Sequence, residues 1–136
     1  MDTVNPEPRS CLPSAASALF GAAMGCAAWS LTAWARAYCD AGYDAGGRFE
    51  LTVLLPLLVA CEAAAGLLAL ATGRRLALQA PAPFHRALPT LLVAVATVGP
   101  AWWFFATRGT LADYPGDSGH CPPSNIPPQW PDWLPA

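Results

Sequence analysis

Three long segments that are almost free of charged residues constrain the fold of this chain more than any other feature. Residues 14–35, 51–72 and 88–106 contain 22, 22 and 19 residues, and Glu62 is the only Asp, Glu, Lys or Arg among them. A helix rises about 1.5 Å per residue, so each segment matches a hydrocarbon core of roughly 30 Å. Three core helices of a soluble bundle are the alternative, but such helices need a polar face and these have none. The sequence therefore predicts an all-α integral membrane protein with three transmembrane helices.

The composition favours the same class. Charged residues make up 12% of the 136-residue chain, whereas soluble domains carry about 25%. All seven basic residues are arginine and alanine is abundant, which is typical of high-GC bacterial genomes, so we expect a bacterial plasma membrane. Small residues at Ala33–Ala37 resemble a signal-peptide cleavage site, which is the alternative for residues 14–35. The acids in the first ten residues and the length of the apolar run favour a retained helix.

The distribution of arginine predicts the direction of threading. The connection Gly73–Arg86 has three arginines and no acid, whereas Arg36–Glu50 has two arginines against three acids. Positive charge is retained on the cytoplasmic side. We therefore expect a cytoplasmic N-terminal segment (1–13), a transmembrane domain (14–107) and an extracytoplasmic tail (108–136).

Four prolines have positions that affect the predicted helices. Pro13 and Pro89 are expected at helix starts, where the missing N–H has no intrahelical partner to lose. Pro56 and Pro100 lie inside the second and third segments and should bend them. The bends indicate either simple packing kinks or helices that splay around an outward-opening cavity.

Small residues predict where two of the helices approach each other. The stretch Gly21–Gly25 is a G-x-x-x-G motif, and Ser17 extends it upstream. Ala65 and Gly66 lie on the Glu62 face of the second segment. Small side chains let backbones approach closely in lipid, so we expect the first two helices to be tightly packed. A separate protein against the Gly21–Gly25 face is the alternative.

Glu62 is the twelfth residue of its segment and so lies near the bilayer midplane. A charge there costs several kcal/mol, so the side chain must face protein or water. Thr97 and Cys26 are expected at the same depth, which predicts an intramembrane polar site of Glu62, Thr97 and Cys26. A neutral Glu62 hydrogen-bonded to Thr97 is the first interpretation. A partner subunit's polar group and a proton or cation step are the alternatives.

Two of the five cysteines fall on the predicted outer side. Cys39 and Cys121 are expected to form a disulfide that ties the tail to the first loop, because this side is oxidising. If the thiols stayed reduced, Cys39, His120 and Cys121 with Asp40 could form a soft-metal site that suits copper. The spacing matches no metal motif, so we expect no metal and no cofactor.

The tail has seven prolines between Asp113 and Ala136, which excludes a helix and favours extended polyproline geometry. Trp130 and Trp133 are therefore predicted to anchor the tail. They would enter the headgroup zone, cover the helix ends or dock in the groove of a partner.

No phosphate-binding loop, nucleophile elbow, zinc-protease motif or basic nucleic-acid patch is present in the sequence. The absence of these motifs favours a protein without enzymatic activity, but it does not exclude an enzyme. The first functional hypothesis is an accessory or assembly subunit of a larger membrane complex, with the lipid bilayer and other membrane subunits or copies of itself as partners. The second is a homo-oligomeric transport or proton-conducting protein that uses Glu62. The third is an outer-face redox or metal protein built on Cys39, His120 and Cys121.

Overall fold

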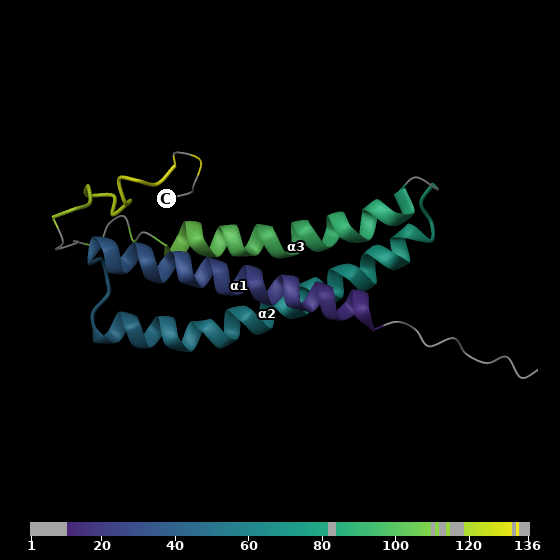
Figure 1. The fold of residues 1–136 in the computed structure, drawn as a ribbon, viewed down its shortest axis with the longest axis horizontal. Helices are drawn as coiled ribbons and strands as arrows, with labels where there is room; N and C mark the ends of the chain where they lie inside the picture. Colours follow the sequence, from purple (N-terminus) through teal and green to yellow (C-terminus); the bar gives the residue numbers. More distant parts are fainter. Residues whose placement is uncertain are drawn as a thin grey trace, which may run out of the picture.

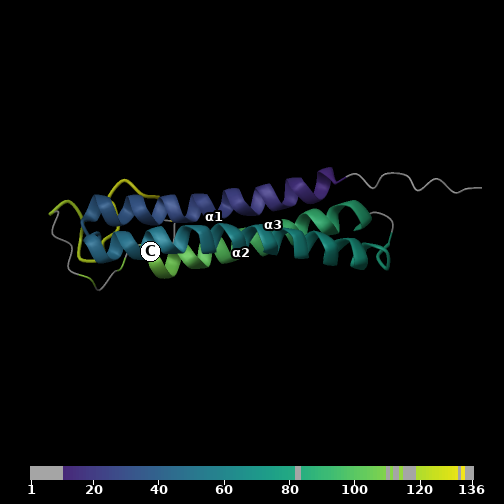
Figure 2. The same ribbon diagram turned by 90° about the horizontal axis from the view of Figure 1, so that it is seen from below.

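A computed structural model describes residues 11–81, 84–109, 111, 114, 119–131 and 133. It contains three helices, α1 (Leu12–Cys39), α2 (Ala45–Ala77) and α3 (Phe84–Arg108). They lie side by side along the long axis of the molecule (Figures 1 and 2). Each helix is long and apolar enough to cross a membrane, so the predicted fold class is confirmed.

The helices are longer than the three apolar segments. α1 contains 28 residues, α2 contains 33 and α3 contains 25. At 1.5 Å per residue α2 reaches about 50 Å, so its two ends extend beyond a hydrocarbon core of roughly 30 Å. Arg36 and Glu50, which were expected to border a loop, therefore lie inside helices. An apolar run marks the part of a helix that lies in lipid, and the backbone hydrogen bonds continue past it.

The placement of Pro89 at a helix start was wrong. α3 begins at Phe84 and continues through both Pro89 and Pro100, as α2 continues through Pro56. Pro89 instead packs against α2, because a Cβ added at Gly73 would lie 2.6 Å from the Pro89 Cα. The glycine therefore makes room for the proline ring at this crossing.

The connection between α1 and α2 is only five residues long. Asp40 takes a left-handed conformation at the end of α1 (φ 50°), and its N–H donates to the carbonyl of Arg36. Asp44 caps the start of α2, where its Oδ1 accepts from the Gly47 N–H at 2.7 Å. Both are standard ways of satisfying backbone groups at helix ends. Asp40 is thus a helix-terminating residue.

α1 and α2 pack through the predicted small residues. A Cβ added at Gly21 would collide with the backbone carbonyl of Glu62, and one at Gly66 would collide with that of Ser17. At Gly25 an added Cβ would lie 3.1 Å from the Val59 Cα. Ala65 is partly exposed and lines a surface pocket with Leu92, Val95 and Ala96 of α3, so it does not belong to this contact. The Gly21–Gly25 face is therefore covered by α2 of the same chain.

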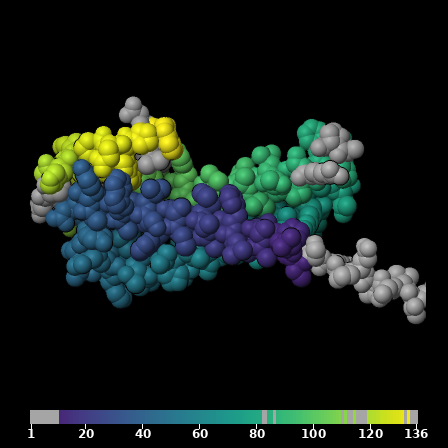
Figure 3. Space-filling view, viewed as in Figure 1, coloured from purple at the N-terminus to yellow at the C-terminus, as the bar shows by residue number. Residues whose placement is uncertain are grey.

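The tail turns back over the bundle at the end where α1 joins α2. Figure 3 shows the described part of the tail covering α1 and the adjoining part of α3 at this end. We call this the disulfide end, because it contains the Cys39–Cys121 bond. The tail and this end of the three helices together form the cap. Residues 1–10 of the predicted N-terminal segment, and the predicted tail residues at 110, 112–113, 115–118, 132 and 134–136, lie outside the described residues.

Candidate functional site: a sealed carboxyl and a disulfide-anchored cap

Glu62 is enclosed by its own chain. Its exposed fraction is 2%, and it lies on the α2 face that packs against α1. A Cβ added at Gly25 would lie 3.3 Å from the Glu62 Cγ, so the side chain fills the space that this glycine leaves. Its Oε2 has no hydrogen-bond partner among the described residues. The acid is therefore buried within one protomer and is not presented to a neighbouring subunit.

Thr97 does not form the hydrogen bond expected with Glu62. It is fully buried, but its hydroxyl donates to the Val93 carbonyl at 2.9 Å, within α3. Threonine hydroxyls in helices often bond the carbonyl four residues earlier, and this local partner competes with a carboxyl on another helix. The Thr97 methyl group faces Gly66, at 3.6 Å from an added Cβ.

Cys26 does not join this site either. It is exposed on the outer surface of α1, about 100° around the helix from Gly25. Residues at one depth in a membrane share a site only when their helices are rotated to face each other. Cys26 was grouped with Glu62 and Thr97 only because the three were expected at the same depth in the membrane, and depth does not fix the direction in which a side chain points.

A buried arginine at the disulfide end joins the three helices, and sequence reasoning had assigned it no role. Arg36 of α1 is 2% exposed, and its Nε and Nη2 donate to the Arg108 carbonyl at 2.9 and 2.7 Å. This carbonyl is at the C-terminus of α3, where the helix dipole favours a cation. Glu50 of α2 lies 3.9 Å from Arg36 and 3.1 Å from the Arg108 side chain. We call Arg36, Glu50 and Arg108 the arginine latch.

A signal for the arginine latch was present in the sequence. The buried residues Gly21, Gly25, Ala28 and Thr32 follow one face of α1 at steps of three or four, and one further step of four reaches Arg36. A charged residue in register with a small-residue face is directed into the bundle. Only the identity of its acceptor, a carbonyl 72 residues away in the chain, required the structure.

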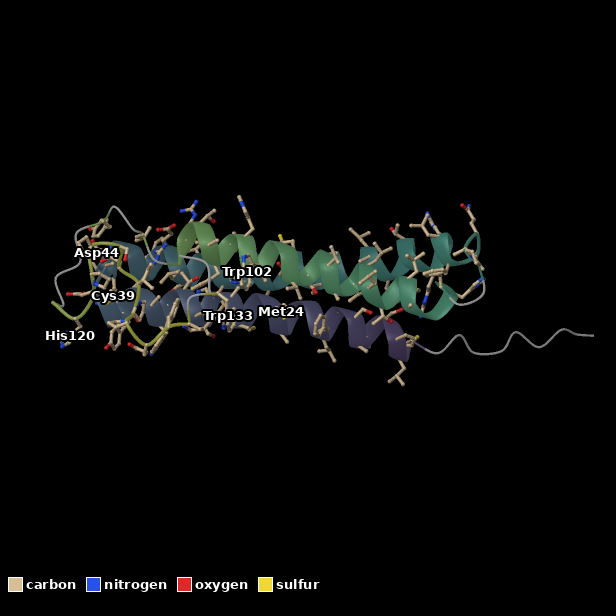
Figure 4. All side chains as sticks on the ribbon, turned by 90° about the horizontal axis from the view of Figure 1, so that it is seen from above. Met24, Cys39, Asp44, Trp102, His120 and Trp133 are labelled. Atoms are coloured by element: carbon tan, nitrogen blue, oxygen red, sulfur yellow. A yellow bond between two sulfur atoms is a disulfide. The ribbon has the colours of Figure 1, made fainter. Side chains whose placement is uncertain are left out.

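The predicted disulfide between Cys39 and Cys121 is confirmed, with the two Cα atoms 5.4 Å apart. It uses both thiols that the copper alternative required. His120 lies beside the Tyr38 ring, with 6.3 Å between the ring centroids. Within the described ranges, no group of three or more His, Cys, Asp or Glu side chains is placed to hold a metal ion. Figure 4 labels Cys39, Asp44 and His120 at this end of the bundle.

Asn125 holds the fold of the tail and was not identified from the sequence. It is 2% exposed, and its Nδ2 donates to the carbonyls of Leu111 and Tyr114 at 2.8 and 2.6 Å. Its φ of 55° is one that asparagine adopts more readily than most residues. The Asn125 carbonyl lies 3.2 Å from the Cys39 sulfur, so the side chain orders the tail directly beside the disulfide.

The two tail tryptophans pack on this chain's own helices. Trp130 stacks on Trp34 of α1, with ring centroids 5.4 Å apart, and contacts Phe105 of α3 at 5.2 Å. Trp133 stacks on Trp102 of α3 at 6.2 Å. Aromatic pairs at these separations contribute about 0.5–1.5 kcal/mol beyond the area they bury. The tail therefore runs along the groove between α1 and α3.

Replacing Cys121 with serine is expected to release the tail from the bundle. Native disulfides typically contribute about 2–5 kcal/mol, so the Asn125 and Trp130 amides should exchange with solvent at least about tenfold faster. These amides now donate to the Pro122 and Pro127 carbonyls. Hydrogen exchange followed by mass spectrometry measures the change. Cys61→Ser is the matched control, because Cys61 is a free, exposed cysteine; equal exchange in the two variants would show that stacking alone holds the tail.

No family model, curated protein or solved structure matches this chain. The fold and the site therefore define its class without help from relatives. Three helices of membrane-spanning length, closely packed around a buried carboxyl, make it a small multi-pass membrane protein with a disulfide-bonded cap.

Proposed function

We propose that the protein is an accessory or assembly subunit of a larger complex in a bacterial plasma membrane, and that its cap is the surface that binds a partner. One observation supports this more than any other. The tail is held in a single arrangement by a disulfide, a buried asparagine and two tryptophan stacks. A surface that is already ordered loses little conformational entropy when it binds.

The exposed residues of the cap suit protein recognition. Several large aromatic side chains are at least one-third exposed at this end: Trp34, Tyr38, Phe49, Trp102, Trp103, Tyr114 and Trp133. Tryptophan and tyrosine are enriched in the energetically dominant parts of protein interfaces. They also favour the membrane–water boundary, so a partner would meet them at the level of the headgroups.

The disulfide supports placing the cap on the extracytoplasmic side. Disulfides persist in oxidising compartments and are rare in the reducing cytoplasm. The opposite end contains Arg74 and Arg75 in the last turn of α2, as expected for a cytoplasmic end. The N-terminus would then be cytoplasmic and the tail extracytoplasmic.

In the sequence, the small-residue face of α1 and the midplane acid both suggested a partner protein. In the structure, neither is available to such a partner. The Gly21–Gly25 face is occupied by α2, and Glu62 is enclosed within the chain. The proposal therefore depends on the cap, and it predicts that changes at the cap disturb assembly.

Gentle detergent extraction followed by native mass spectrometry tests the proposal. The intact chain should be recovered with at least one unrelated membrane protein. Trp103→Ala should reduce that recovery, because Trp103 is 68% exposed at the disulfide end. Phe20→Ala, a 44% exposed aromatic residue in the opposite half of α1, is the control. Recovery of the chain alone, or only with copies of itself, would reject the proposal.

A homo-oligomeric transport or proton-conducting protein is the second candidate, and the unpartnered Oε2 of Glu62 favours it. Ionisable residues inside the membrane commonly mark ion or proton pathways. It ranks second because Gly21 and Gly25, the α1 residues against Glu62, offer no second ionisable group to relay a proton. Reconstitution in liposomes with a pH-sensitive dye separates the two candidates. If the protein conducts protons, Glu62→Gln should abolish the proton flux that the dye reports. If it is an accessory subunit, the Glu62→Gln variant should still be recovered with its partner.

A further inference from the structure

An apolar groove runs between α1 and α3 beneath the end of the tail. It has a volume of about 280 Å³, and its walls include Met24 and Ala27 from α1 and Val98 and Ala101 from α3. Trp102 and Trp133, which stack on each other, also line it, and Phe105 of α3 lines it nearer the disulfide end. Figure 4 shows Met24, Trp102 and Trp133 lying together, farther into the bundle than Cys39.

The chemistry of the groove selects a hydrocarbon. Its lining side chains are all apolar apart from the indole N–H groups, so it offers almost nothing to a polar ligand. The volume of about 280 Å³ is well above the roughly 150 Å³ of an apolar cavity that admits benzene. Small residues, Ala27 and Ala101, leave the space open, while larger side chains form the walls.

The depth of the groove matches one leaflet of the bilayer. Val98 precedes Arg108 by ten residues, and Met24 precedes Arg36 by twelve, which correspond to about 15 and 18 Å of helix. The arginine latch marks the polar boundary at this end, and half of the hydrocarbon core is about 15 Å. The groove therefore extends from near the headgroups to about the midplane, along surfaces of α1 and α3 that already face lipid.

We propose that this groove is a binding site for one acyl chain of a membrane phospholipid from the leaflet at the disulfide end. The groove is continuous with the lipid-facing surface of the helices, so a chain enters it sideways without crossing a polar layer. Trp133 lies over the chain near its headgroup, where an indole has both apolar contacts and a polar partner for its N–H. The site shares Trp102 and Trp133 with the cap, but it does not rest on the proposed subunit role, because it needs no protein partner.

Photocrosslinking in vesicles tests the site. The protein is reconstituted in phosphatidylcholine containing lysophosphatidylglycerol with a diazirine near the end of its single chain. Crosslinks should concentrate on the peptides that contain Met24–Leu31 and Val98–Trp102. They should exceed those at Val53 and Leu57, which are exposed on α2 in the same half of the bundle. Unlabelled lysophosphatidylglycerol should saturate the groove crosslinks and leave the α2 crosslinks unchanged, because bulk lipid contact does not saturate.

A matched pair of variants completes the test. Ala27→Phe would fill the groove and should reduce its crosslinks to the α2 level, whereas Ala60→Phe, at an exposed alanine of α2 outside the groove, should leave them intact. Formation of the Cys39–Cys121 disulfide reports that each variant is folded. Even, non-saturating crosslinks over all exposed apolar positions would overturn the site.

Discussion

Gly21→Ala is expected to force α1 away from α2 and to destabilise the folded bundle by about 2–3 kcal/mol, as overpacking of a close contact does. The reason is geometric: an added Cβ at Gly21 would collide with the backbone carbonyl of Glu62. A backbone atom cannot move aside as the end of a flexible side chain can. The displaced helix would also loosen the enclosure of Glu62 and let water reach the carboxyl. Reversible unfolding in mixed micelles with increasing dodecyl sulfate measures the change.

Gly99→Ala is the matched control for this prediction. No heavy atom lies within 4 Å of a Cβ added at Gly99, which is an exposed position in α3. Alanine has the higher helix propensity by about 1 kcal/mol, so this variant should be as stable as the parent protein or slightly more stable. If the two variants lost stability equally, the close approach of α1 and α2 at Gly21 would be disproved.

The second large effect is expected from Arg36→Ala, which removes the centre of the arginine latch. Two bonds from a charged donor to the Arg108 carbonyl are lost, and each bond of this kind contributes roughly 1.5–3 kcal/mol. The change also leaves a cavity between the helices. We therefore expect the free energy of unfolding to fall by about 3 kcal/mol. Faster hydrogen exchange in the last turn of α3 should accompany this fall.

Two further variants identify the cause. Arg36→Lys keeps the charge but lacks the planar fork that makes two bonds to one carbonyl, so it should recover only part of the lost stability. Arg48→Ala removes an exposed arginine whose guanidinium lies 5.6 Å above the Tyr43 ring, a contact contributing about 0.5–1 kcal/mol. A loss for Arg36→Ala no greater than that for Arg48→Ala would mean that the latch contributes no stability.

The glycine face and Glu62 are occupied inside the bundle, so neither is available to bind a partner. Features that indicate a binding surface in the sequence, a glycine face and a midplane acid, serve within the three-helix bundle. The cap and the groove between α1 and α3 remain accessible, from solvent and from lipid respectively. The two proposals concern these two surfaces, which meet at Trp102 and Trp133. The variants that test them lie outside the arginine latch and the contact between α1 and α2.

The sequence alone predicted the number of helices, the pairing of Cys39 with Cys121 and the tight packing of the first two helices. Which surface the Gly21–Gly25 face meets was decided by the structure. The three predictions follow from local properties: the length of an apolar run, the side of the membrane on which a loop falls, and the spacing of small residues. They do not depend on how the helices are rotated about their axes.

Tertiary structure decided which side chains meet. Thr97 and Cys26 share a depth with Glu62, yet one bonds within its own helix and the other is exposed on the surface of α1. Arg36 was expected to border the connection between the first two segments, and it joins three helices. The sequence also left open whether Trp130 and Trp133 enter the headgroup zone, cover the helix ends or bind a partner. The structure places them along α1 and α3. The physical reason is that a side chain's partner depends on the rotation and offset of separate helices, and these are set by packing across the whole bundle.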